Sequence, residues 1–159
     1  MSNIRKITAA LLVLSVFLFA LSGCSSSPKE PITAETFNST MQENNFTVTD
    51  ATSQFEAGLV NSVTIAVNKA ATYQIEFYVV PSAERARSSY EQNRVHFKEL
   101  KGSAAVETEV FLPSYARYTL TSDGKFYIVS QIGNTFIFAQ NIASSDKAEV
   151  EDILKELGY

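Results

Sequence analysis

The feature that most constrains the fold is a series of strand-like segments near the carboxyl end, separated by tight-turn dipeptides. Segments 126–132 and 135–140 flank Gly133-Asn134, and Asp123-Gly124 separates segment 115–121 from segment 126–132. Such dipeptides favour short hairpin turns because their residues readily adopt positive φ. Strands joined by connections this short pair antiparallel. The pattern therefore predicts consecutive antiparallel hairpins.

Periodicity predicts the remaining elements. Apolar residues that alternate with polar ones predict four upstream strands, at 46–50, 62–67, 73–79 and 106–110. Thr33 and Ser82 are predicted N-caps of two helices, and the apolar stripe of Val150, Ile153, Leu154 and Leu157 predicts a third, closing helix. The order helix-βββ-helix-ββββ-helix predicts an α+β domain, in which an antiparallel sheet of about six to seven strands carries three helices, mainly on one face.

Several of these strands are apolar on both sides. A sheet that is covered by helices on only one face does not explain this pattern. The residues are Phe126-Tyr127-Ile128-Val129 and Phe136-Ile137-Phe138, joined by Tyr78, Val80 and Phe111. Either the last hairpin is central and covered on both faces, or the sheet has an open, partly apolar face that binds a partner. On the second interpretation, Tyr78, Phe111 and Tyr127 are candidate surface residues.

The amino-terminal segment has the pattern of a secretory leader. Arg5 and Lys6 precede a mostly apolar run, residues 7–20. As a helix this run would be about 21 Å long, which is short of the roughly 30 Å hydrocarbon core of a bilayer. A charged start, a short apolar run and small residues at the end are typical of a leader that is removed after export.

The end of this leader, Leu21-Ser22-Gly23-Cys24, resembles the lipobox of bacterial lipoproteins at all four positions. The resemblance implies a thioether-linked diacylglycerol on Cys24, with cleavage just before it. It therefore implies an extracytoplasmic protein of the bacterial cell envelope, anchored in the membrane by its amino-terminal lipid. The predicted organisation is a signal peptide at 1–23, an acylated cysteine and polar tether at 24–31, and one globular domain at 32–159.

Charge and cysteine content narrow the function further. The chain of 159 residues has 13 basic and 17 acidic side chains, and removal of Arg5 and Lys6 with the leader leaves 11 against 17, a balance of −6. A balance this acidic argues against nucleic-acid binding. Cys24 is the only cysteine, so no intramolecular disulfide can form. The predicted partners are the membrane, through Cys24, and a protein, a peptide or a cell-wall component.

Two clusters of charged residues are candidates for chemistry. Arg94 and Lys98 lie beside the apolar stripe of the second helix, where they either contact an anionic polymer or headgroup, or cover the edge of the core while their charges stay solvated. Glu76, Glu107 and Glu109 fall on the less apolar side of their strands. They are either the solvated side of the sheet or, if these strands are neighbours, a carboxylate cluster for a hard cation or for acid–base chemistry.

No motif in the globular part identifies an enzyme family, a metal site or a cofactor site. Glycine-rich phosphate loops, Gly-x-Ser-x-Gly, His-Glu-x-x-His and EF-hand spacing are all absent from the sequence. We therefore assign no catalytic residue, no metal ligand and no cofactor. The expected function is a non-enzymatic binding or accessory module; the alternatives are an envelope enzyme that uses the carboxylate cluster, and an inhibitor or scaffold that blocks a partner's surface.

Overall fold

A computed structural model describes residues 28–159. The predicted leader, the lipobox with Cys24 and the first part of the tether lie outside the described residues. Within residues 28–159, no helix is long and apolar enough to cross a membrane.

The described chain folds as the sequence predicts, into helix-βββ-helix-ββββ-helix. The α-helices are α2 (Ala34–Glu43), α3 (Ala83–Glu99) and α4 (Lys147–Glu156), with short 3-10 turns at Thr52–Gln54 and Ser144–Asp146. The strands are β1 (Thr47–Asp50), β2 (Ser62–Val67), β3 (Gln74–Val79), β4 (Val106–Phe111), β5 (Tyr115–Ser122), β6 (Lys125–Ile132) and β7 (Thr135–Ala143). They form one seven-stranded sheet in the order β1-β2-β3-β7-β6-β5-β4, antiparallel throughout, so the predicted α+β class is confirmed.

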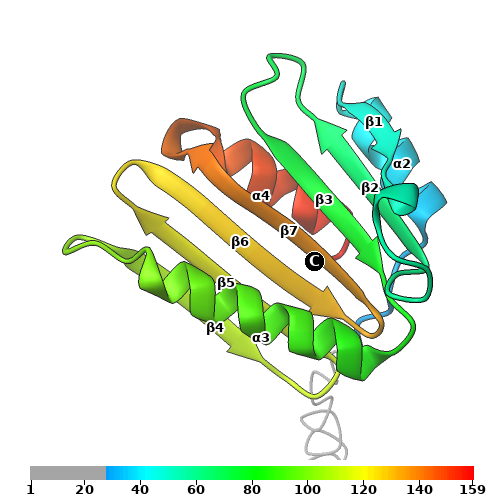
Figure 1. Cartoon of the computed structure of the whole chain (residues 1–159). Helices are drawn as coiled ribbons and strands as arrows, with labels where there is room; N and C mark the ends of the chain where they lie inside the picture. The colour runs from blue at the N-terminus through cyan, green and yellow to red at the C-terminus, as the bar shows by residue number, and fades with distance from the viewer. Residues whose placement is uncertain (1–27) are drawn as a thin grey trace, which may run out of the picture.

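The strand order follows from the path of α3. This helix carries the chain from β3 to the far edge of the sheet, where β4 begins, and the meander β4-β5-β6-β7 then returns toward β3 (Figure 1). Strand β7 closes the gap by pairing with β6 on one side and with β3 on the other. The two halves of the sheet therefore join at β3 and β7.

Helices cover both faces of the sheet, two on one and one on the other (Figure 1). Helices α2 and α4 bury the larger core, in which Phe37 of α2 stacks on Phe77 of β3 with ring centres 4.9 Å apart. Helix α3 covers the opposite face of β5, β6 and β7, through Ala86, Tyr90 and Phe97.

The central strand β6 is apolar on both sides because each side is buried in a different core. Phe126 and Ile128 belong to the core beneath α2 and α4, whereas Tyr127 and Val129 belong to the core beneath α3. The first interpretation of the two-sided pattern is therefore confirmed for the last hairpin, which is central and covered on both faces.

The predicted caps place α2 and α3. The Thr33 hydroxyl accepts a hydrogen bond from the backbone N–H of Thr36 at 3.2 Å, and the Ser82 hydroxyl accepts one from that of Arg85 at 3.3 Å. Each satisfies an amide that has no partner inside its helix. Pro81, directly before Ser82, ends the preceding extended segment, so α3 starts at the end of the sheet where β3 stops.

Candidate functional site

Helix α3 leaves part of its face of the sheet uncovered. It packs against β5, β6 and β7 but lies away from β1, β2 and most of β3 (Figure 1). Because directly opposed residues of antiparallel strands point to the same side, the register identifies the residues that share this side. Of these, Val63 is buried and Phe138 packs beneath α3. We call the remaining residues, with Gln140 beyond them on β7, the open sheet face: Ile65, Val67, Gln74, Glu76, Tyr78, Phe136 and Gln140.

One end of the open sheet face contains an aromatic hollow of about 350 Å³. Tyr78 stacks on Phe136, with ring centres 4.4 Å apart and planes 4° from parallel, and Phe55 meets Tyr78 edge-on at 5.9 Å. The exposed side chain of Leu59 and the first turns of α3 complete the wall. The full lining is Phe55, Leu59, Val60, Tyr78, Val80, Arg85, Ser88, Ser89 and Phe136.

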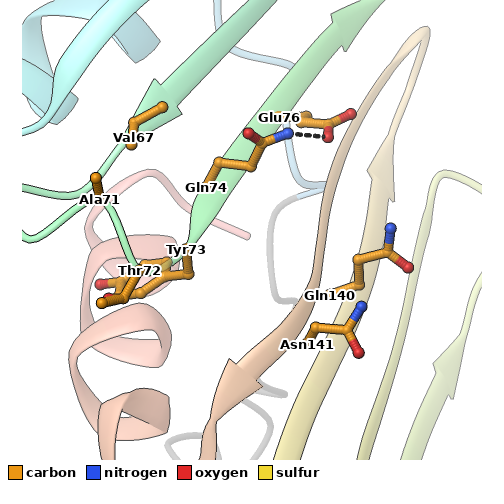
Figure 2. A pocket seen from close by; sticks show the side chains of 8 residues that line it. All are labelled: Val67, Ala71, Thr72, Tyr73, Gln74, Glu76, Gln140 and Asn141. Atoms are coloured by element: carbon orange, nitrogen blue, oxygen red, sulfur yellow. Dashed lines mark hydrogen bonds between the residues drawn. The ribbon is translucent and has the colours of Figure 1, made fainter.

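The other end contains a polar hollow of about 320 Å³, shown in Figure 2. Gln74 and Glu76 come from β3, and Gln140 and Asn141 from β7. The Gln74 amide donates to the Glu76 carboxylate at 2.7 Å. Val67, Ala71, Thr72 and Tyr73 complete the lining.

Strand β3 connects the two hollows. Gln74, Glu76 and Tyr78 alternate along one side of it, and the Glu76 carboxylate accepts hydrogen bonds from both neighbours. Burial raises the pKa of the Tyr78 phenol above its ordinary value, and the bond to Glu76 adds to the shift. The phenol hydroxyl donates its hydrogen bond to Glu76. These groups can bind a ligand through hydrogen bonds and ring contacts, but they include no activated nucleophile.

The three predicted glutamates do not converge. Glu76 and Glu109 share a side of the sheet, but the row between them runs through Phe138, Val129 and Tyr118. Four strand spacings of about 4.8 Å put their backbones roughly 19 Å apart. In residues 28–159 no group of three potential metal-binding side chains comes together. The condition for the carboxylate cluster, neighbouring strands, is therefore not met.

Glu107 and Glu109 instead pair with cations from α3 and the residues that follow it. Lys101 lies 2.8 Å from Glu107, and Glu109 lies 3.4 Å from both Arg94 and Lys98. Arg94 also contacts Glu91 at 2.8 Å. Arg94 and Lys98 are thus paired with carboxylates of the same domain, an arrangement that neither interpretation predicted. The two ion pairs with Glu109 link α3 to the edge strand β4.

The candidate surface residues lie in three different places. Tyr78 lines the aromatic hollow, as an open-face residue should. Tyr127 is only 7% exposed and packs against Phe97 at 5.4 Å, so it belongs to the core beneath α3. Phe111 is 57% exposed but lies at the end of β4, on the opposite edge of the sheet. The structure therefore does not join them into one surface.

Sequence reasoning missed most of the lining of both hollows. Phe55 and Leu59 lie in the segment between β1 and β2, where no regular pattern predicts a position. Gln140 and Asn141 interrupt an otherwise apolar strand, and that interruption was a readable signal. Asn141 has φ of 57° next to the irregularity in β6–β7 pairing, and its side-chain oxygen accepts a hydrogen bond from the Tyr127 hydroxyl at 3.2 Å.

Comparison with known proteins adds little. No family model matches the chain, and no curated protein matches it. Among solved structures it is similar to a GTP binding regulator from Thermotoga maritima, at 16% identity and a TM-score of 0.43, over 81% of this chain and 89% of the other. A likeness this weak supports no statement about function.

Proposed function

We propose that this protein is a lipid-anchored, extracytoplasmic protein of the bacterial cell envelope, and that its domain is a non-enzymatic binding module. The address rests on the leader and on the lipobox that ends at Cys24. A polar spacer, Ser25-Ser26-Ser27, links that cysteine to the first described residue, Pro28. The proposed partner is a peptide or protein segment, or a cell-wall polymer.

The observation that carries the binding proposal is the pair of hollows on the open sheet face. From Gln74 to Tyr78, β3 spans about 13 Å at roughly 3.3 Å per residue. An extended chain laid along it would meet amide and carboxylate groups at one end and the Tyr78–Phe136 pair at the other. Binding sites for small ligands are usually apolar pockets with a small number of polar groups that fix the ligand's orientation.

Cross-linking from the open sheet face tests this proposal. A photo-reactive amino acid at Gln140 should capture a peptide or glycan in intact cells, whereas the same residue at Val95, exposed on α3, should not. Adding Tyr78→Ala should abolish the adduct at Gln140, because it removes the aromatic wall of the other hollow. Equal adducts from both positions, or an adduct at Gln140 that is unaffected by Tyr78→Ala, would contradict a binding site here.

A further inference from the structure

The connection between β4 and β5 exposes two large apolar side chains in succession. Phe111 is 57% exposed and Leu112 is 53% exposed. Pro113 and Ser114, also exposed, complete this connection, which we call the apolar turn (residues 111–114).

Arg87 holds the apolar turn in place. Its guanidinium donates to the backbone oxygens of Leu112 at 2.6 Å and Pro113 at 2.9 Å, and lies 4.4 Å from the centre of the Phe111 ring. The Leu112 amide also donates to the Tyr115 carbonyl at 2.7 Å. The backbone is thus fixed by the protein, while the outer surfaces of Phe111 and Leu112 remain in water.

The amino-terminal end of the described chain lies at the same end of the domain. The Lys29 ammonium lies 4.2 Å from the centre of the Tyr115 ring and donates to the Gly158 carbonyl at 2.5 Å. A Cβ atom placed on Gly133 would lie 3.2 Å from Cγ of Pro31, and the Gly133 amide bonds to the Ser114 carbonyl at 3.2 Å. The chain therefore enters the domain beside the apolar turn (Figure 1).

The length of the tether then limits how far this end can be from the membrane. Pro28 follows Cys24 by four residues, so their Cα atoms can be at most about 14 Å apart at roughly 3.6 Å per residue. If Cys24 carries the lipid, this end of the domain faces the lipid surface. Helices that lie in a membrane interface bury their apolar faces about 5–10 Å deep at the boundary between headgroups and acyl chains, because this removes apolar surface from water. The same gain is open to exposed apolar side chains on a turn.

We propose that the apolar turn inserts Phe111 and Leu112 into the membrane interface and so fixes the orientation of the domain. This inference rests on the proposed lipid anchor. It places the polar hollow, at the start of β3 and the end of β7, on the side away from the membrane. A second copy of the chain suits this edge poorly, because antiparallel pairing of β4 with itself brings the Glu107 and Glu109 carboxylates opposite one another.

The sequence provides a clean reporter because it contains no tryptophan. The experiment uses the full lipoprotein, purified with its lipid and reconstituted in phosphatidylcholine vesicles, with or without bromine on the acyl chains. Leu112→Trp is compared with Val106→Trp, which lies at the other end of β4 and is 64% exposed. Matching unfolding midpoints establish that both variants fold.

The expected result is a shift of the Leu112→Trp emission to shorter wavelength in vesicles and strong quenching by the brominated lipid, with neither at Val106→Trp. If the protein is bound to the vesicles but both positions are quenched equally, the proposed insertion of the apolar turn is wrong, whereas the proposed lipid anchor is not affected. A blue shift that grows with protein density but is insensitive to bromine indicates self-association and also overturns it. If the intact mass shows no lipid on Cys24, both the anchor and the insertion fail.

Discussion

Glu107 shows how a residue that resembled a catalytic carboxylate has a structural role. Its carboxylate accepts hydrogen bonds from Lys101 and from the Tyr118 hydroxyl, each at 2.8 Å. These two hydrogen bonds link the edge strand β4 to the segment that follows α3 and to the neighbouring strand β5. The hydrogen bond from Lys101, then that from Tyr118, lowers the pKa of Glu107 below its ordinary value of 4.5.

This shift predicts how stability depends on pH. A carboxyl group whose pKa is lower in the folded state stabilises the fold above its unfolded pKa, near 4.5, and this contribution is lost as the pH falls through the folded value. Glu107→Gln should therefore lower the unfolding midpoint at pH 7 and reduce its decline on acidification. Thermal melts between neutral and acidic pH measure both effects.

The matched control for Glu107 is Glu99→Gln. Glu99 is exposed at the end of α3, and among the described residues it forms no ion pair. The Glu99→Gln variant should show the same dependence of the unfolding midpoint on pH as the wild type. If the midpoints of wild type and Glu107→Gln fall in parallel between pH 7 and 3, the carboxylate has no role of this kind.

At the scale of elements, helix α3 sets the topology, because it carries the chain from β3 to the far edge of the sheet. It also covers β5, β6 and β7 on the side that carries the open sheet face.

The start of α3 depends on Ser82, whose hydroxyl is the N-cap. Ser82→Ala should destabilise the domain by about 1 kcal/mol, the usual effect of losing such a cap. Ser82→Asp should restore the loss, because aspartate is also a good cap and its charge suits a helix amino terminus. Urea unfolding of the three proteins measures the difference; an equal loss in both variants would mean that packing, not capping, involves Ser82.

Local pattern predicted most elements but not how they are arranged. The caps and the turn dipeptides act on their immediate neighbours, so Thr33, Ser82, Asp123-Gly124 and Gly133-Asn134 could be read directly from the sequence. The pairing of β7 with β3 depends on residues about sixty positions apart, which no local signal encodes. Without this pairing, the sequence could not show that three strands, β7, β6 and β5, separate Glu76 from Glu109.

Sequence pattern could identify a residue of the candidate site only where an apolar side chain lies on the polar side of its strand. Tyr78 was identified because β3 is apolar on both sides, and it does line a hollow. The same reasoning failed for Tyr127, since periodicity shows that two faces are apolar but not which is covered by a helix. The covering helix α3 lies over β6, not over β3, and this is a property of the assembled sheet.

At the scale of the whole molecule, the two proposals describe one arrangement. Lys29, Pro31 and the apolar turn lie at one end of the sheet, and the polar hollow opens at the other. Strands that run between these ends would stand away from the membrane and present the open sheet face sideways. A partner in the space outside the membrane could then reach Gln74 and Gln140 without crossing the lipid headgroups.

This arrangement depends on Cys24, so the last prediction concerns that residue. In the wild type we expect cleavage directly before Cys24, which removes residues 1–23, and a mass increase from diacylglycerol on the new first residue. Cys24→Ala should keep its leader and gain no lipid, because alanine has no thiol to alkylate. Ser27→Ala, a substitution of equal size outside the four-residue lipobox, should be processed as the wild type is. Intact-mass spectrometry of the three membrane-extracted proteins distinguishes these species, and a wild-type chain with an intact leader or a free thiol would remove the basis for the lipid anchor and for the membrane insertion of the apolar turn.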